Sequence, residues 1–221
     1  MRMYNADGSE GKMCGNGIRC LGKYVFEHQM TDKTSLTVET RGGIKTLDLI
    51  IENDQVAYVK VDMGKPELKA PNIPVICEND HFINQPVMVL GKEYAATAVS
   101  MGNPHCVIFL KNIESLNLKD IGPFFENQKI FPDRVNTEFA EVISPTLIKM
   151  RVWERGSGET QACGTGACAA AVAACLNGIS KQGTDITVKL AGGDLNIRWE
   201  KDQTVYMKGP ASFIFEGTIT I

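Results

Sequence analysis

The sequence predicts an α+β fold of two pseudo-symmetric lobes, each a mostly antiparallel, barrel-like sheet around a central apolar helix. Two observations predict it. A cysteine-containing motif recurs near both ends of the chain, and strand-like segments bounded by turn residues fill most of the remainder. Such a repeat indicates two copies of one structural unit. The 221 residues are ample for one or two domains with a real core.

The repeat centres on the motif C-G-x-G. The first copy reads D-G-S-E-G-K-M-C-G-N-G-I-R-C and ends at Cys20, and the second reads R-G-S-G-E-T-Q-A-C-G-T-G-A-C and ends at Cys168. The likeness continues downstream, where each copy has Thr-Val, then Gly-Gly, then a strand-like segment, then Asp-Gln. The Asp-Gln pairs are read as hairpin turns.

Each motif opens a predicted helix. Segment 14–28 has apolar residues at near-helical spacing, and segment 163–176 is small and apolar on every side, which is typical of a fully buried helix. Asn177-Gly178 would end the second helix. Strands are predicted at 57–62, 86–90, 106–110, 137–143, 148–153 and 213–221. We therefore expect an N-terminal lobe over 1–62, a C-terminal lobe over 63–210 and a final strand over 211–221 that returns to the first lobe.

The two copies differ in what precedes them. Strand-like sequence from about Pro86 onward leads to the second motif, whereas only the first few residues of the chain precede Cys14. Strands that lack partners leave an exposed sheet edge. By symmetry, we expect the N-terminal lobe to be incomplete at its start.

Composition excludes several classes of protein. A net charge of −3 without a basic run argues against a nucleic-acid or membrane-surface partner, and no apolar stretch is long enough to span a bilayer. The seven cysteines are odd in number and no secretory signal opens the chain. Reduced thiols and a cytoplasmic location are therefore expected. No Cys/His group has zinc spacing, so no metal site is predicted.

Cysteines at two helix starts suit proton transfer at a carbon atom. Unpaired N–H groups in a first helical turn stabilise a thiolate and bind carboxylates. One thiolate would remove an α-proton, and the other thiol would return a proton to the opposite face. A lone cysteine is more often a small buried hydrophobe, and five are interpreted so: Cys20, Cys77, Cys106, Cys168 and Cys175. A phosphate-binding loop is the other meaning of a glycine-rich helix start, but neither copy matches its pattern.

At these residues the chain resembles the diaminopimelate epimerase family along nearly its whole length. The resemblance rests on four segments: N-A-D-G-S (5–9) leading into M-C-G-N-G-I-R-C (13–20), M-G-N-P-H-C-V (101–107), R-V-N-T (134–137), and E-R-G-S-G-E-T (154–160) leading into A-C-G-T-G (162–166). It implies interconversion of LL- and meso-2,6-diaminopimelate without cofactor or metal, on the bacterial route to lysine and the cell wall. It also implies a cytosolic homodimer. Family members begin several dozen residues earlier, with a G-N-D-F-like motif that this chain lacks.

The resemblance also implies roles for individual residues. Cys14 and Cys163 match the catalytic cysteines, and His105 and Glu154 match polar residues that orient the reacting amine. Arg155 would pair with the distal carboxylate of the substrate, in bidentate fashion where geometry allows. The other matches are to substrate-binding positions: Asn5, Asn103 and Asn136 for the distal end, and Gly15, Asn16, Gly164 and Thr165 for the reacting carboxylate. Taken singly, the polar residues also suit plain turn, capping or surface roles.

Two alternatives stay open. A proline-type racemase resembles this family in fold and in its two cysteines, but it should lack an anchor of the Arg155 type. A non-catalytic or inactive, shortened member would keep the fold without turnover. Cys14→Ala and Cys163→Ala should each abolish inversion if the two-thiol interpretation is right.

Overall fold

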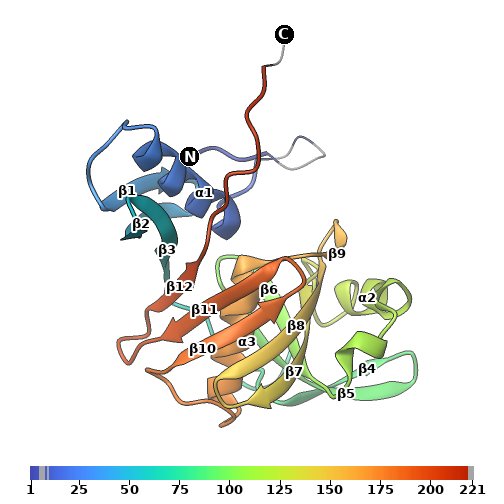
Figure 1. Ribbon diagram of the computed structural model, residues 1–221. Coiled ribbons are helices and arrows are strands. Elements are labelled where there is room, and N and C mark those ends of the chain that lie inside the picture. Colours follow the sequence, from blue (N-terminus) through green and yellow to red (C-terminus); the bar gives the residue numbers. More distant parts are fainter. Residues whose placement is uncertain (5–7, 9, 219–221) are drawn as a thin grey trace.

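A computed structural model describes all of the chain except residues 5–7, 9 and 219–221, and it shows a smaller and a larger lobe (Figure 1). The smaller lobe contains α1 (Gly15–Glu27), β1 (Ser35–Thr40), β2 (Gly43–Glu52) and β3 (Gln55–Gly64). The larger lobe contains β4 (Gln85–Val89), β5 (Lys92–Ser100), β6 (Pro104–Phe109), α2 (Leu118–Glu126), β7 (Asn136–Ser144), β8 (Leu147–Glu154), β9 (Gly158–Thr160), α3 (Gly164–Leu176), β10 (Asp185–Leu190), β11 (Gly193–Trp199) and β12 (Val205–Gly209). Short 3₁₀ turns lie at Ala70–Asn72 and Ile113–Ser115.

The strands form one sheet that both lobes share. Its order is β1-β2-β3-β12-β11-β10-β8-β7-β6-β5-β4, with β9 paired to β8. The pairs β6–β7 and β8–β10 are parallel and the others are antiparallel. The predicted α+β class, with mostly antiparallel sheet and a helix in each lobe, is confirmed. The division into 1–62 and 63–210 stays a prediction, since backbone hydrogen bonds between β3 and β12 cross it.

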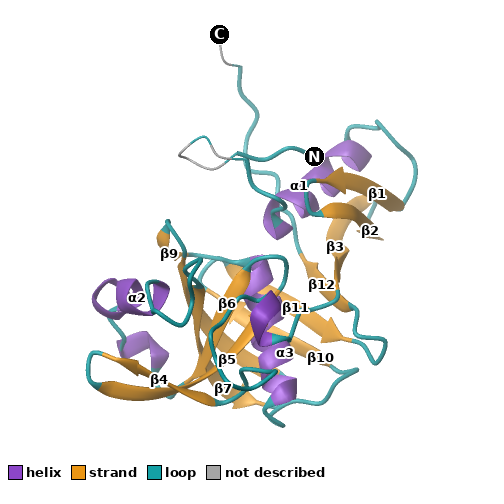
Figure 2. Ribbon diagram, turned by 180° about the vertical axis from the view of Figure 1, so that it is seen from behind, coloured by secondary structure: helices purple, strands orange, loops and turns teal. Residues whose placement is uncertain are grey.

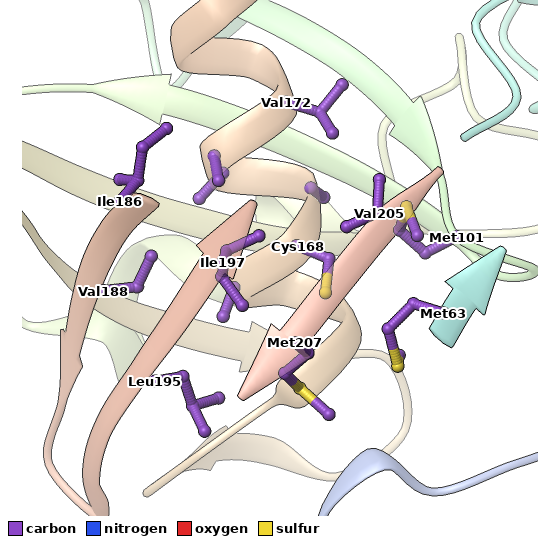
Figure 3. Close-up of a cluster of buried hydrophobic side chains, with 14 of the residues drawn as sticks. Met63, Met101, Cys168, Val172, Ile186, Val188, Leu195, Ile197, Val205 and Met207 are labelled. Atoms are coloured by element: carbon purple, nitrogen blue, oxygen red, sulfur yellow. The ribbon is translucent and has the colours of Figure 1, made fainter. Parts of the chain in front are cut away.

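The helix α3 runs through the middle of the larger lobe, with strands around it (Figure 2). Its residues from Ala167 to Ala174 are all fully buried, as the all-round apolar sequence predicts. Small side chains allow the strands to approach the helix closely. Figure 3 shows side chains of β10, β11 and β12, among them Ile186, Ile197 and Met207, facing Cys168 and Val172 of α3. This core holds the start of α3 firmly in place.

The same core continues into the smaller lobe. Ile18 of α1 and Leu47 of β2 are fully buried in it, and Met63 of β3 lies beside the larger lobe's side chains (Figure 3). A second cluster fills the far end of the larger lobe, where Phe125 of α2 packs edge-on against Tyr94 and Phe139. The lobes are therefore joined both by the sheet and by apolar packing, which fixes α1 against α3.

The expected final strand is not formed over residues 213–218. These residues are exposed, and the segment leaves β12 and runs past the smaller lobe (Figure 1). The alternating apolar residues favour a strand, but a strand also needs a neighbour that supplies backbone partners. None of the described strands pairs with this segment. Among the described helices, none is both long and apolar enough to cross a membrane.

Candidate functional site

Both motif cysteines cap a helix. Cys14 precedes α1 and its Sγ accepts a hydrogen bond from the N–H of Gly17 at 3.3 Å. Cys163 precedes α3 and its Sγ accepts from the N–H of Gly166 at 3.4 Å. The backbone of each cysteine is extended, so that its side chain turns back onto the first turn of its helix. The predicted equivalence of the two copies is therefore seen in the local geometry.

The starts of α1 and α3 meet across the junction of the lobes. A Cβ atom on Gly164 would lie 3.5 Å from the Cα of Gly15, and glycine at both positions permits this approach. The side-chain amide of Asn16 donates to the carbonyl of Ala162 at 3.3 Å, which links the two helix starts directly. Arg19 donates to Oδ1 of Asn16 at 3.2 Å and orients this amide. The N–H groups of both first helical turns are thus brought to one place.

Polar side chains surround the thiol of Cys163. The hydroxyl of Thr165 lies 3.4 Å from its Sγ, and the amide of Asn103 donates to that hydroxyl at 3.4 Å. The ring Nε2 of His105 is 3.1 Å from Oδ1 of Asn103. The predicted residues Asn103, His105, Cys163 and Thr165 therefore form one connected group.

One member of this group was not found by sequence reasoning. Nδ1 of His105 lies 2.6 Å from Oε1 of Glu138 on β7, and both side chains are fully buried. The available signal was an acidic residue at an interior position of the predicted strand 137–143, followed by Phe139 and Ala140. Charged residues are rarely fully buried unless they are paired. A buried acidic residue in this strand therefore predicts a partner side chain that donates a hydrogen bond to it.

Glu154, Arg155 and Asn136 lie near the end of β8. The backbone N–H of Arg155 donates to Oδ1 of Asn136 at 2.9 Å, and the amide of Asn136 donates to the carbonyl of Pro104 at 3.0 Å. Asn136 therefore shapes the turn that carries Arg155. Nη1 of Arg155 donates to the carbonyl of Asp133, and the side chain forms no ion pair with any described residue. Its charge is available for an anion.

The electrostatics at Cys163 differ from the prediction for a helix-start cysteine. Burial raises the pKa of the Cys163 thiol well above its ordinary value, and the carboxyl groups of Glu154 and Glu138 raise it further. Thr165 and the N–H of Gly166 lower this pKa but are outweighed. The Cys163 residue is only 6% exposed. Desolvation therefore favours the thiol over the thiolate at this cysteine.

The structure places every predicted site residue except Asn5, which lies outside the described residues. The hydroxyl of Thr160 donates to the carboxylate of Glu154, which holds that side chain. No group of three or more His, Cys, Asp or Glu residues in the described part of the chain could hold a metal ion.

Comparison with known proteins decides the family. The family model described as diaminopimelate epimerase matches residues 1–69 and 97–214. The chain belongs to the diaminopimelate epimerase family. It is 54% identical to a diaminopimelate epimerase of Acetivibrio thermocellus, with 100% of this chain and 79% of that protein covered. It is 53% identical to one of Bacillus cytotoxicus, over 98% of this chain and 76% of the relative.

A solved structure of the same fold is more distant in sequence. The hydroxyproline epimerase of Agrobacterium vitis has a TM-score of 0.72 at 12% identity, covering 97% of this chain and 69% of that one. This likeness supports the two-lobed α+β fold. The family match covers the segments that carry both motif cysteines, which ties the two helix starts of this chain to the diaminopimelate epimerase pattern.

Proposed function

We propose that this chain interconverts LL- and meso-2,6-diaminopimelate by proton transfer between the substrate and two cysteines. The observation that carries the proposal is the meeting of two cysteine-capped helix starts, with Gly15 and Gly164 almost in contact. A small amino acid held at this junction would have a thiol near each face of its Cα. Membership of the family supports the choice of diaminopimelate as substrate.

The state of Cys163 gives the direction of the first step. Because burial and two carboxyl groups favour its thiol, Cys163 acts as the acid and Cys14 as the base. The Cys14 thiolate takes the α-proton, and the electron pair of the C–H bond moves into the substrate carboxylate. Cys163 then returns a proton to the opposite face of Cα. N–H groups at the starts of α1 and α3 would stabilise the charge on the carboxylate.

The remaining predicted residues would fix the substrate. Asn16, Gly15, Gly164 and Thr165 lie at the helix starts, where they suit the reacting carboxylate. Arg155 has no ion pair among the described residues and suits the distal carboxylate. Asn136 contacts the backbone N–H of Arg155, and Asn103 contacts Thr165; both are proposed for the distal end. Glu154 and His105 suit the amine beside the reacting carbon. Asn5 is proposed for the distal end on sequence grounds alone.

The proposal includes a cytoplasmic homodimer. All seven cysteines are free, which is consistent with a reducing compartment. The proposed enzyme acts in the synthesis of lysine and of the peptidoglycan precursor. Size-exclusion chromatography with light scattering would measure the mass in solution, and a monomer would contradict the proposed dimer.

Exchange of the α-proton tests the proposed reaction. The reduced protein is incubated with LL-2,6-diaminopimelate in D₂O, and NMR follows both the α-proton signal and the appearance of the meso isomer. Deuterium incorporation with inversion is expected, and Cys14→Ala and Cys163→Ala should each abolish it. Cys77→Ala is a matched control outside the site. Retention of inversion in the double variant of Cys14 and Cys163 would refute the two-thiol scheme.

A further inference from the structure

A buried carboxyl group behind the site is assigned no contact with the substrate in the reaction proposed above. Glu138 lies in the middle of the sheet, with β6 on one side of its strand and β8 on the other. Its side chain is fully buried. Removing a carboxylate from water is unfavourable unless strong partners replace the water. The contacts of this carboxyl group should therefore show what stabilises it in the core.

The partner of Glu138 is the ring of His105. Oε1 lies 2.6 Å from Nδ1, slightly shorter than the usual range of about 2.7–2.9 Å for a charge-assisted N–H···O hydrogen bond. The second oxygen, Oε2, has no hydrogen-bond partner among the residues that the structure describes. Among the described residues, His105 is thus the side-chain hydrogen-bond partner of this carboxyl group, and Nε2 of the same ring faces Oδ1 of Asn103.

A continuous series of polar contacts runs from Glu138 to the reacting thiol. His105 contacts Asn103 at 3.1 Å, Asn103 contacts Thr165 at 3.4 Å, and the Thr165 hydroxyl lies 3.4 Å from Sγ of Cys163. Rotation of the His105 ring would break the first of these contacts. Glu138 therefore fixes the end of the series that lies farthest from the thiol.

Glu138 also lies against the turn that caps Cys163. A Cβ atom on Gly166 would come within 2.6 Å of Oε1, so the glycine leaves the room that the carboxyl group occupies. The N–H of the same glycine donates to Sγ of Cys163. The carboxyl group thus reaches the thiol by two routes, through His105 and through the first turn of α3.

The titratable groups around Glu138 come from three elements. His105 and Cys106 lie on β6, Glu154 lies at the end of β8, and Cys163 lies at the start of α3. Burial raises the pKa of Glu138, and the His105 interaction opposes this rise. Glu138 in turn contributes to the raised pKa of Cys163 and of Cys106, where burial is the larger cause.

The corresponding region behind Cys14 carries a basic side chain. Arg19 is 8% exposed and donates to the carbonyls of Gly15 and Pro210 and to Oδ1 of Asn16, but it pairs with no carboxylate among the described residues. Burial lowers the pKa of Arg19, and the nearby cysteines, Cys14 among them, oppose this. The two helix starts are similar in sequence, but a buried guanidinium group lies behind one and a buried carboxyl group behind the other.

We propose that Glu138 is a positioning residue: it accepts a hydrogen bond from Nδ1–H of His105, so that Nε2–H donates to Oδ1 of Asn103, and its carboxyl group packs against the turn of α3 that caps Cys163. The effect on turnover rests on the proposed function. The hydrogen bond to His105 and the effect on the Cys163 thiol do not depend on the proposed function, because both are measured without substrate.

The first test compares Glu138→Gln with the matched control Glu141→Gln, on the same strand but outside the site. Glutamine keeps an oxygen acceptor for Nδ1 and removes the charge. Mass spectrometry of peptides gives the rate of alkylation by iodoacetamide at each cysteine as a function of pH. The midpoint at Cys163 should fall by about one pH unit in Glu138→Gln, with no shift at Cys14 and none at either cysteine in the control. An unchanged midpoint at Cys163, or an equal shift at both cysteines, would overturn the proposal.

A second test uses the unaltered chain and does not depend on the folding of a variant. The chain has three histidines, and His28→Gln and His81→Gln, at two exposed positions, assign the ¹⁵N signals by elimination. Both ring nitrogens of His105 should carry a proton, because Nδ1 faces Oε1 of Glu138, Nε2 faces Oδ1 of Asn103, and both oxygens accept. An unprotonated Nδ1, with the proton on Glu138 instead, would contradict the proposal.

Turnover separates this proposal from the proposed function. In an active protein, Glu138→Ala, which removes the acceptor for Nδ1, should lower kcat about tenfold, with a smaller change in KM, by analogy with the loss of the partners that orient metal-binding histidines. Unchanged kcat would overturn the positioning role. If the unaltered chain fails to turn over diaminopimelate, the proposed function fails, whereas the alkylation and ¹⁵N results still decide the role of Glu138.

Discussion

The carboxyl group of Glu126 on α2 organises the turn that carries Arg155, and its removal should weaken both stability and substrate binding. Glu126 is 7% exposed. Its Oε1 accepts from Nη1 of Arg134 at 3.0 Å and from the N–H of Gly156 at 2.9 Å, and its Oε2 accepts from Nε1 of Trp153 at 2.8 Å. The change to test is Glu126→Ala, with Glu126→Gln as the more conservative variant.

The size of the effect follows from the donors that lose their partner. In Glu126→Ala, the N–H groups of Trp153 and Gly156 lose their acceptor. Trp153 is partly buried and Gly156 is exposed, so the cost is about 1 kcal/mol for each lost hydrogen bond at most. Arg134 is half exposed and its ion pair contributes little. We therefore expect the free energy of unfolding to fall by about 1–2 kcal/mol. Glu126→Gln turns an N–H group toward Trp153 or Gly156 and should lose about half as much.

Urea unfolding followed by tryptophan fluorescence measures the stability, and initial rates measure KM and kcat. KM for diaminopimelate should rise by a larger factor than kcat falls, because the freed turn moves Arg155 rather than the cysteines. Glu52→Gln, at an exposed strand end, is the control. If Glu126→Ala were as stable as the unaltered chain and had the same KM, the inferred role of α2 in supporting this turn would be wrong.

Three further changes test the packing and the buried charges. Gly122→Ala should lower the free energy of unfolding by about 1–3 kcal/mol in urea, because its Cβ would lie 2.2 Å from Cδ2 of Trp153; unaltered stability would contradict this close contact. Burial raises the pKa of Cys168 from 9.0 to about 12, so its contribution to stability is complete below pH 9 and is lost as the pH rises towards 12. Urea titrations between pH 8 and 11 should show a smaller decline in Cys168→Ala, and an identical decline would count against the shift. Arg19→Lys should cost about 2 kcal/mol and slow α-proton exchange, because one ammonium group cannot reach all three acceptors that hold the guanidinium; full exchange with full stability would show that the guanidinium contacts are dispensable.

The sequence predicts a helix or strand well where the spacing of its apolar residues agrees with the packing that the fold provides. α3 begins and ends within a residue of its expected position, since small apolar residues on every side have only a buried helix as a stable outcome. α2 was missed because Gly122 and Pro123 within nine residues argue against a helix. Its stability comes from elsewhere, with Phe125 packed against Tyr94 and Phe139. The opposite error occurred at 213–218, where the local pattern favours a strand but no described strand pairs with it.

In the candidate site, too, some residues could be predicted from the sequence and others could not. The cysteines were found because the motif recurs, and the repeat alone is enough to place them at helix starts. Glu126 and Glu138 were not found, because each is a single carboxyl group whose partners come from other elements. No spacing in the sequence connects Glu138 to His105. Their contact depends on the parallel pairing of β6 with β7, which the sequence does not specify.

The repeat predicts likeness, but inversion of a carbon centre needs a difference between its two copies. Two identical cysteine sites would hold their protons equally, and one of them has to hold a proton while the other lacks it. The helix starts cannot supply this difference, because each gives its thiol the same N–H contact. The surroundings supply it: burial, together with the carboxyl groups of Glu154 and Glu138, raises the pKa of Cys163, whereas the buried group behind Cys14 is the guanidinium of Arg19. The repeated motif thus provides two thiols and two sets of N–H donors, and residues outside it decide which thiol keeps its proton.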